Sequence, residues 1–255
     1  MRILILGGTT EASQLARLLA DDGRFEATMS LAGRTASPKQ QALPTRIGGF
    51  GGIAGLQDWL RENGIAAVID ATHPYAAQIS AHAVASCNAL SIPLGSIIRA
   101  PWTREHGDNW IEAETTEAAA RALGDAPARV FLSIGRQELS PFAAAPRHHY
   151  IARTIDPPDV ALPPDISFVH DRGPFDAVSE EAFLARERIG VIVSKNSGGV
   201  ATYPKIIASR RLRIPVVMIG RPHKPHGTAL DSPEAAIHWL ETQSAHRASS
   251  SRRGV

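Results

Sequence analysis

The sequence contains few cysteines and lysines, and each shortage restricts the kinds of site and ligand that can be expected. Cys87 is the only cysteine among 255 residues, which excludes an internal disulfide and a cysteine-rich metal site. Arginine supplies most of the 27 basic residues, and its planar guanidinium group suits carboxylates and phosphates. The 25 acidic residues nearly balance this charge. We therefore expect no general attraction to nucleic acid and no nucleic-acid partner.

Long hydrophobic runs are also missing. No stretch of about 18 apolar residues occurs, which argues against a membrane-spanning helix. The opening segment "MRILILGG" has an apolar run far too short for a secretory signal. We expect a cytoplasmic protein with no membrane partner.

What the sequence does contain is an alternation of apolar strands and amphipathic helices. In the first part, strands are expected at 2–8, 25–33, 66–74 and 92–100, with helices at 10–23, 55–64 and 76–90. In the second part, strands are expected at 129–135, 191–199 and 214–222, with helices at 115–123, 180–190, 203–213 and 232–243. Uniformly apolar strands separated by helices indicate parallel sheets covered on both faces.

The fold class predicted from this pattern is α/β, with two Rossmann-like parallel-sheet domains facing each other across a cleft. The expected domains are residues 1–100 and 101–242, followed by a disordered tail, 243–255, which is polar and basic. The two halves also resemble each other, since "VIDATHPYA" at Val68 corresponds to "VIVSKNSGG" at Val191 and "IPLGSIIRAP" at Ile92 to "IPVVMIGRPH" at Ile214. Duplication and convergent architecture explain this equally well.

The first candidate site is the turn after the first strand, "LILGGTTEA". Glycines let a backbone approach a pyrophosphate, and a helix N-terminus attracts it. Thr9 and Ala12 stand where the dinucleotide motif G-x-G-x-x-G has glycines, so a tight turn without a ligand is the alternative. The cofactor-binding residues expected here are Gly7, Gly8, Thr9, Thr10 and Glu11.

The second candidate is "SLAGRTAS", at the end of the second strand. An NAD-binding enzyme carries a carboxylate for the ribose 2′-hydroxyl at this point, whereas an arginine attracts a 2′-phosphate. Arg34 therefore predicts NADP(H) as the cofactor, unless it is an ordinary surface arginine. Its expected neighbours in this subsite are Ser30, Gly33 and Thr35.

Two further segments complete the predicted cofactor site. "IGGFGGIAG" is dense in glycine, as expected of a backbone passing close to a ligand, although a ligand-free loop is also possible. It contributes Gly49, Phe50, Gly51 and Gly52. "DATHPYAAQ" places Thr72 at a strand end, and His73 and Tyr75 are the candidate catalytic residues for proton delivery. The alternative for His73 is a hydrogen-bonding wall of the pocket, and water or groups of the substrate are the alternative proton donors.

The second half supplies a predicted anion-binding edge for the substrate. Its residues come from "LSIGRQEL", "HDRGPF", "VSKNSGG" and "IGRP", and they are Arg136, Gln137, Arg172, Lys195, Asn196, Ser197, Gly198, Gly199 and Arg221. No metal is expected, because adjacent histidines such as His148 and His149 point to opposite faces of a strand.

Taken in order, "LGGTTEA", "LAGRT", "GGFGG", "DATHPYA", "GRQEL" and "KNSGG" make residues 1–240 similar to the precorrin-6A reductase family of cobalamin biosynthesis. The resemblance implies NADPH-dependent reduction of precorrin-6A to precorrin-6B by hydride transfer that saturates the C18–C19 bond. It also implies a tetrapyrrole substrate whose carboxylates meet the cationic edge.

Other functions remain open beside this resemblance. One is a cobalt-precorrin-6A reductase using NADH or NADPH, and another is a non-catalytic NADP(H)-binding sensor. A short-chain dehydrogenase is disfavoured because no Tyr-x-x-x-Lys occurs, and a periplasmic-type binding protein because no signal sequence is seen. The sequence leaves the oligomeric state unknown.

Overall fold

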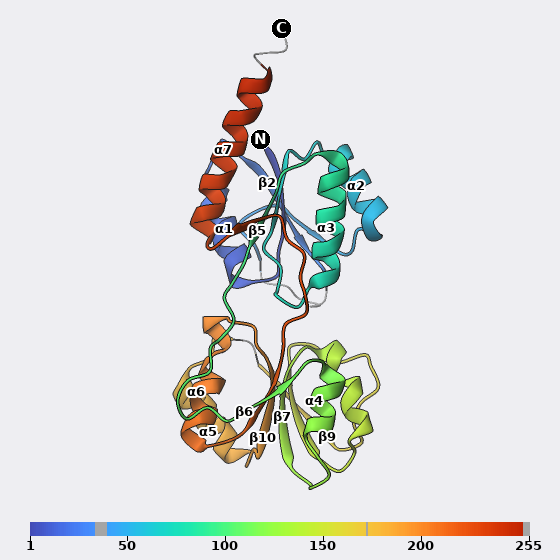
Figure 1. The fold of residues 1–255 in the computed structure, drawn as a ribbon, viewed down its shortest axis with the longest axis vertical. Helices are drawn as coiled ribbons and strands as arrows, with labels where there is room; N and C mark the ends of the chain where they lie inside the picture. Colours follow the sequence, from blue (N-terminus) through green and yellow to red (C-terminus); the bar gives the residue numbers. More distant parts are fainter. Residues whose placement is uncertain (34–39, 172, 252–255) are drawn as a thin grey trace. The chain divides into compact units, whose positions relative to one another are not determined.

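The computed structural model describes residues 1–33, 40–171 and 173–251, and it divides the chain into two compact units (Figure 1). Unit 1 consists of Met1–Arg99 and Pro222–Val255, and unit 2 consists of Ala100–Arg221. The chain therefore enters unit 2 after Arg99 and returns to unit 1 after Arg221.

Unit 1 is built on a six-stranded sheet in the order β12-β5-β4-β1-β2-β3. Every pairing in it is parallel, because each strand returns through a crossover. Its strands are β1 (Arg2–Leu6), β2 (Glu26–Leu31), β3 (Thr45–Ile47), β4 (Ala67–Asp70), β5 (Leu94–Ile97) and β12 (Thr228–Leu230). The central strands β1 and β4 are almost wholly apolar and buried, as a sheet covered on both faces requires.

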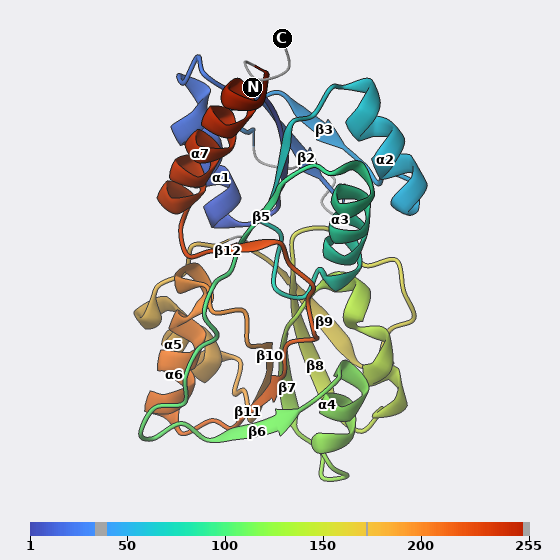
Figure 2. The same ribbon diagram turned by 45° about the horizontal axis from the view of Figure 1, so that its top comes forward.

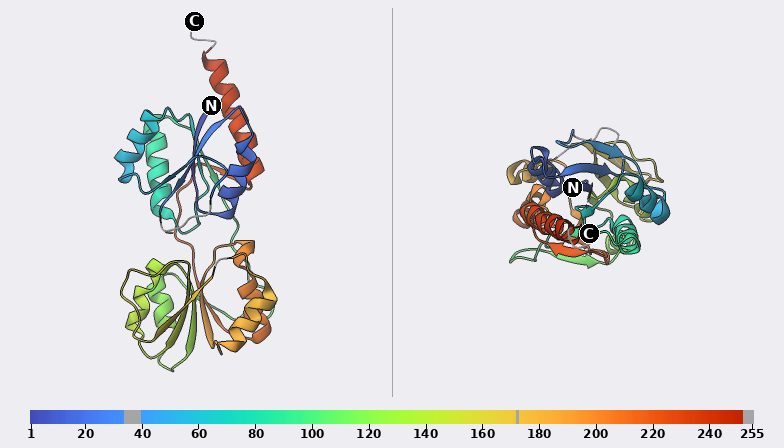
Figure 3. Two further views of the ribbon diagram at one scale, coloured as in Figure 1. Left: turned by 180° about the vertical axis from the view of Figure 1, so that it is seen from behind. Right: turned by 90° about the horizontal axis from the view of Figure 1, so that it is seen from above.

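Helices cover both faces of this sheet (Figures 1 and 3). One face carries α1 (Thr10–Ala20) and α7 (Pro233–Ser251), whose buried Leu15 and Leu240 belong to the same apolar cluster. The other face carries α2 (Gly52–Glu62) and α3 (Ala77–Leu90), with Leu56 and Cys87 in a second cluster. Among the helices of the described residues, none combines the length and apolar character needed to cross a bilayer.

Unit 2 has a second six-stranded parallel sheet, in the order β6-β11-β10-β7-β8-β9 (Figure 2). Its strands are β6 (Trp110–Ala113), β7 (Arg129–Ser133), β8 (His149–Thr154), β9 (Ile166–His170), β10 (Val191–Lys195) and β11 (Val216–Ile219). Its helices are α4 (Thr116–Ala122), α5 (Ala177–Arg186) and α6 (Pro204–Leu212), with short 3-10 helices η1 (Arg136–Glu138), η2 (Ser140–Ala144) and η3 (Val200–Thr202). The two parallel sheets with interleaved helices confirm the predicted α/β class.

The two sheets have the same topology in circularly permuted form. Position by position, β1, β2, β3, β4 and β5 of unit 1 correspond to β7, β8, β9, β10 and β11 of unit 2. The remaining edge strand is β12 in unit 1, which comes last in the chain, and β6 in unit 2, which comes first. The sequence similarity between the two halves therefore joins strands in equivalent positions, β4 with β10 and β5 with β11.

The boundaries of the units differ from those expected from sequence. Strand β12 and helix α7 belong to unit 1, whereas residues up to 242 were expected in the second domain. The physical reason is that β12 pairs with β5, whose edge would otherwise be open, and that α7 packs Ala236 and Leu240 into the core. Helix α7 also continues to Ser251, so the expected disorder from residue 243 does not hold over 243–251.

Candidate active site

The turn between β1 and α1 is held in a single conformation by its glycines and a threonine. Gly7 donates its backbone N–H to Ser30 O at 2.9 Å, and a Cβ on Gly7 would lie 2.2 Å from Met29 Sδ. Gly8 has a φ of +114°, and beyond its two chain neighbours no described residue has an atom within 4 Å of the position its Cβ would take. The backbone at Gly8 is thus open to a ligand, and glycine is required there.

Thr9 joins this turn to the neighbouring strand. Its Oγ1 accepts from Ala12 N at 3.1 Å, as an N-cap residue does, and donates to Ala71 O at 2.7 Å. Thr10 follows as the first residue of α1. Because the first N–H groups of a helix have no intrahelical acceptor, this end of α1 presents donors and a positive dipole to the edge of the sheet.

Glu11, in the first turn of α1, is paired with Arg99. Arg99 Nε lies 2.7 Å from Glu11 Oε1, and Arg99 Nη2 contacts Glu11 Oε2. Burial is the largest influence on the pKa of Glu11 and raises it, but the hydrogen bonds and charge of Arg99 and the local backbone outweigh it, so the pKa is lowered. The carboxylate is ionised, and Arg99 balances its charge.

The ends of β2 and β3 are joined by Arg46. The two strands place Ser30 beside Arg46, and Arg46 Nη1 donates to Ser30 Oγ at 2.8 Å. Gly33, with a φ of +75°, packs against Ile47 and Gly48. The predicted 2′-phosphate residues Arg34 and Thr35 lie outside the described residues.

The glycine-rich loop after β3 turns back on itself in a left-handed conformation. Gly51 and Gly52 have φ values of +80° and +90°, and Gly49 lies beside them. The Phe50 ring packs edge-on against Trp59, with ring centroids 5.6 Å apart. No described atom lies within 4 Å of a Cβ placed on Gly49, Gly51 or Gly52, so the loop backbone is accessible.

A buried carboxylate at the end of β4 holds the next loop. Asp70 Oδ1 accepts from Thr72 N at 3.0 Å and from Thr72 Oγ1 at 2.6 Å, and Asp70 Oδ2 accepts from Ser80 Oγ at 2.6 Å. Lys224 Nζ lies 3.3 Å from Asp70 Oδ2 and 3.3 Å from Thr72 O. Thr72 is thereby fixed at the sheet edge.

The two candidate catalytic residues lie together in this loop. His73 Nδ1 accepts from Tyr75 N at 3.3 Å, and the His73 and Tyr75 ring centroids are 5.5 Å apart. Since Nδ1 is the acceptor, the neutral His73 ring carries its proton on Nε2. This tautomer presents Nε2–H as the group that can donate.

These segments lie along one edge of the first sheet. Strands β4, β1, β2 and β3 are consecutive neighbours, and the carboxyl ends of parallel strands share an edge. The structure therefore brings together all the predicted cofactor and catalytic residues that it describes.

The corresponding edge of unit 2 holds the predicted substrate residues. Arg136 and Gln137 form η1 after β7, and Arg136 Nη1 donates to Pro157 O at 2.7 Å. Glu138 Oε2 accepts from Gly135 N at 3.1 Å, while Glu138 Oε1 contacts Lys195 Nζ at the end of β10. Glu138 stands at the position equivalent to Glu11, but its cation comes from another strand: Lys195 ends β10, the equivalent of β4, whereas Arg99 follows β5, the equivalent of β11.

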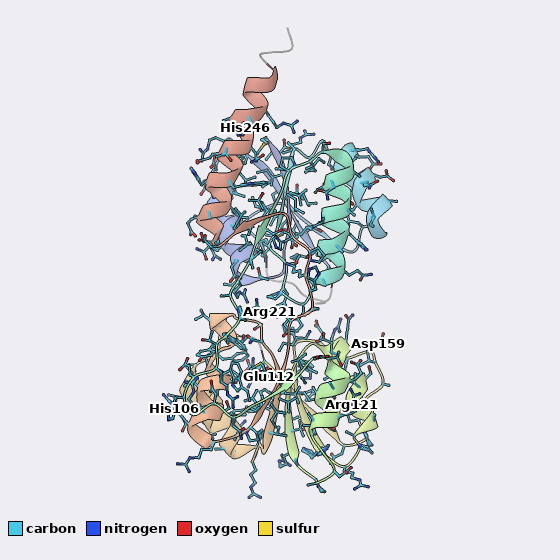
Figure 4. All side chains as sticks on the ribbon, viewed as in Figure 1. His106, Glu112, Arg121, Asp159, Arg221 and His246 are labelled. Carbon is cyan, nitrogen blue, oxygen red and sulfur yellow. The ribbon has the colours of Figure 1, made fainter. Side chains whose placement is uncertain are left out.

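The loop after β10 is tied to the chain that enters unit 2. Asn196 Oδ1 accepts from Trp102 N at 2.7 Å, and Asn196 Nδ2 donates to Trp102 O at 3.0 Å. Arg221, labelled in Figure 4, donates Nε–H to Asn196 O at 2.8 Å and Nη2–H to Ala100 O at 3.1 Å. Gly198, with a φ of +71°, packs so closely that a Cβ would lie 1.9 Å from Ala100 O.

Two further predicted substrate residues, Ser197 and Gly199, lie between β10 and η3. Ser197 Oγ lies 3.4 Å from Thr202 Oγ1, and Gly199 precedes η3. Arg172 lies outside the described residues. Among the residues that the structure describes, no group of three or more histidine, cysteine, aspartate or glutamate side chains could hold a metal ion.

Comparison with known proteins identifies the family. The family model described as "Precorrin-6x reductase CbiJ/CobK" matches residues 2–241. The chain belongs to this reductase family. A relative named precorrin-6A reductase from Rhodobacter capsulatus is 51% identical over 245 residues, which cover 96% of this chain and 97% of the relative. A solved structure named CobK precorrin-6A reductase has a TM-score of 0.90 at 51% identity, covering 95% of this chain and 97% of that one.

A more distant relative is a cobalt-precorrin-6A reductase from Priestia megaterium. It is 26% identical over 255 residues, which cover 94% of this chain and 98% of the relative.

Sequence reasoning missed two residues that shape the site of this reductase, Arg46 and Asp70, and it expected Lys224 in the anion-binding edge of the second half rather than beside Asp70 in unit 1. Asp70 is the first residue of the quoted "DATHPYAAQ", and a carboxylate ending an apolar buried strand is an unusual residue that requires partners. Lys224 is one of only four lysines. Arg46 gives no such signal, because its role depends on the pairing of β2 with β3.

Proposed function

We propose that this reductase converts precorrin-6A to precorrin-6B with NADPH. The observation that carries the proposal is the glycine turn at Gly7 and Gly8, open at Gly8 and leading into the N-terminus of α1, in a chain of the precorrin-6x reductase family. NADPH would supply a hydride to one carbon of the C18–C19 bond while a proton reaches the other, leaving NADP⁺ and the saturated bond. The single cysteine and the absence of long apolar runs favour a cytoplasmic enzyme.

The cofactor would bind to unit 1 rather than to unit 2. The turn after β1 continues into α1, an 11-residue helix whose N-terminus suits a pyrophosphate. The equivalent turn after β7 continues into η1, which has three residues and offers no comparable dipole. Gly7, Gly8, Thr9 and Thr10 would hold the pyrophosphate, and the loop from Gly49 to Gly52 would lie along the adenosine.

Glu11 contributes to this site indirectly. A carboxylate in the first turn of α1 would repel a pyrophosphate, but Arg99 neutralises it through two contacts. Glu11 therefore holds Arg99 beside the helix N-terminus, where the guanidinium group adds positive charge.

Proton delivery is assigned to His73 and Tyr75. His73 would give up its proton from the imidazolium form and return to the neutral ring, in which the hydrogen bond from Tyr75 N to Nδ1 favours the remaining proton on Nε2. Asp70, Thr72 and Lys224 fix the loop that carries both side chains. A group held in this way can donate to the substrate without losing conformational freedom at that step.

Unit 2 would bind the carboxylates of the tetrapyrrole. Arg136, Lys195 and Arg221 follow β7, β10 and β11, which are neighbours in the sheet. The substrate-binding set proposed here also includes Gln137, Arg172, Asn196, Ser197, Gly198 and Gly199. Arg136→Ala should weaken tetrapyrrole binding while leaving the affinity for cofactor unchanged.

The metal-free substrate is favoured over the cobalt-containing one. The relative named precorrin-6A reductase is 51% identical to this chain, whereas the relative named cobalt-precorrin-6A reductase is 26% identical. Anaerobic assays with both tetrapyrroles would decide, and faster reduction of the cobalt form would reverse the assignment.

The cofactor is tested by titrating the purified protein with NADPH and with NADH. NADPH should bind more tightly, and Arg34→Ala should weaken NADPH by about 1.5–3 kcal/mol more than NADH if the contact is charge-assisted. Equal affinities of the wild type for both cofactors would contradict the assignment of NADPH.

A further inference from the structure

Arg46 is a half-buried cation without a counter-ion. No carboxylate among the described residues forms an ion pair with it, whereas the partly buried Arg99, Arg153 and Arg210 are all paired with acidic side chains. Burial also lowers the pKa of Arg46. A charged group that has lost water without gaining a counter-ion is costly, and a bound anion would offset that cost.

The guanidinium group is aimed and held by its surroundings. Arg46 Nη1 donates to Ser30 Oγ at 2.8 Å and to Gly48 O at 3.0 Å, and Nη2 donates to Gly49 O at 2.9 Å. Its Cζ lies 3.8 Å from the centroid of the Phe50 ring. These contacts occupy three of the five N–H donors of an arginine, so donors remain for an anion.

The location of Arg46 indicates which anion would bind to it. Ser30 is the penultimate residue of β2, at the strand end where dinucleotide-binding sheets read the ribose 2′-position. Because Ser30 Oγ accepts from Arg46, its own O–H is directed elsewhere and can donate to a phosphate oxygen. The neighbouring loop is open, since no described atom lies within 4 Å of a Cβ placed on Gly48 or Gly49.

We infer that Arg46 and Ser30 belong to the subsite for the 2′-phosphate of NADPH and that Arg46 contributes to the preference for NADPH over NADH. This inference rests on the proposed function and deepens it. Arg46 acts as the fixed cation of the subsite, and it also holds the ends of β2 and β3 at the spacing that the phosphate requires.

The test compares adenosine 2′,5′-bisphosphate with adenosine 5′-monophosphate, which differ only in the 2′-phosphate. Calorimetry on the full chain gives the ratio of their affinities. In Arg46→Ala this ratio should fall by about tenfold or more, because a charge-assisted contact is lost. Arg46→Lys, which keeps the charge but loses the fork, should give an intermediate ratio.

Arg2→Ala is the control, because Arg2 begins β1 at the amino edge of the same parallel sheet and pairs with Glu26 at 3.0 Å. Its ratio should equal that of the wild type. Circular dichroism checks folding, and if Arg46→Ala does not fold, Arg46→Lys and Ser30→Ala provide the comparison.

The outcomes separate this inference from the proposed function. If the wild type prefers the bisphosphate and folded Arg46→Ala keeps the same ratio, Arg46 is structural and the inference is overturned while NADPH stands. If the wild type binds both nucleotides equally, or neither, the cofactor assignment falls and the subsite falls with it.

Discussion

Glu11 and Arg99 form a two-contact ion pair at the carboxyl edge of the first sheet, with Arg99 Nε 2.7 Å from Glu11 Oε1. Glu138, at the equivalent position of unit 2, forms an ion pair with Lys195. In both units the glutamate stands three residues after a glycine of the strand-to-helix turn, and the cation follows a different strand. The permuted halves of the protein thus pair an equivalent carboxylate with cations from non-equivalent strands, Arg99 after β5 and Lys195 at the end of β10.

Removal of Arg99 should expose this carboxylate to the cofactor. In Arg99→Gln, the charge of Glu11 at the N-terminus of α1 would repel the pyrophosphate, and we expect NADPH affinity to fall roughly fivefold, or about 1 kcal/mol. The pKa of Glu11, now lowered, should rise in the variant, so binding should recover partly as the pH falls toward 5. Fluorescence titration of NADPH measures both effects.

The double variant Glu11→Gln/Arg99→Gln provides the control. Because it removes the repelling charge together with its partner, most of the affinity should return. A double variant as weak as Arg99→Gln alone would mean that Arg99 contacts the cofactor itself.

The carboxylate of Asp70 should be important for stability. Asp70 is 1% exposed, accepts from Thr72 and Ser80, and faces Lys224. Asp70→Asn leaves Lys224 without its anion and turns one acceptor into a donor, so we expect the free energy of unfolding to fall by about 3–5 kcal/mol. Urea denaturation measures this.

Asp58→Asn is the comparison for Asp70→Asn. Asp58 pairs with Arg61 on the surface of α2, where both side chains are more than half exposed, and its loss should cost less than about 0.5 kcal/mol. Similar effects of the two substitutions would show that the Asp70 network does not stabilise unit 1.

We expect any side chain at Gly198 to destabilise the protein. Gly124 is the control that separates backbone strain from a steric clash. Both have φ near +70°, but a Cβ on Gly198 would lie 1.9 Å from Ala100 O, whereas no described atom lies within 4 Å of a Cβ on Gly124. We expect Gly124→Ala to destabilise by about 1 kcal/mol through backbone strain alone, and Gly198→Ala by at least about 2 kcal/mol more. Equal losses in thermal or urea unfolding would contradict the close contact.

The strands at the centre of each sheet could be predicted from sequence, because β1, β4 and β10 are short apolar runs buried on both faces. The edge strands β6 and β12 have four and three residues and show no such run. The assignment of β12 to unit 1 depends on its pairing with β5, which local pattern does not encode.

The same distinction applies to the candidate site. Gly7 and Gly8 could be predicted as site residues because the strand-to-helix turn requires glycine itself. The role of Arg46 requires the register that places it beside Ser30, and the pair of Lys224 with Asp70 joins residues 154 positions apart. Contacts of this kind arise from tertiary packing, so no regular spacing of residues in the sequence predicts them.

Lys205 in α6 is a buried cation in unit 2. It is 5% exposed, its Nζ lies 5.2 Å from the centroid of the Trp102 ring, and it acts electrostatically on the ion pair of Arg153 with Glu180. Burial is the largest influence on its pKa, followed by Glu180, which raises it, and Arg153, which lowers it. The net result is a pKa lowered to about 8.

This pKa predicts how stability depends on pH. An unfolded lysine titrates at about 10.4, so between about pH 8 and 10 the unfolded chain binds more protons and the contribution of Lys205 to stability rises with pH. At pH 7 the buried charge is a cost, and Lys205→Met, which leaves Arg153 and Glu180 paired, should equal or exceed the wild type in stability. Its advantage should shrink by about 2–3 kcal/mol between pH 7 and 10 in urea denaturation, since the variant lacks the titrating group while all other groups are shared. A difference between the two proteins that stays constant over this range would show that Lys205 titrates as an ordinary, hydrated lysine.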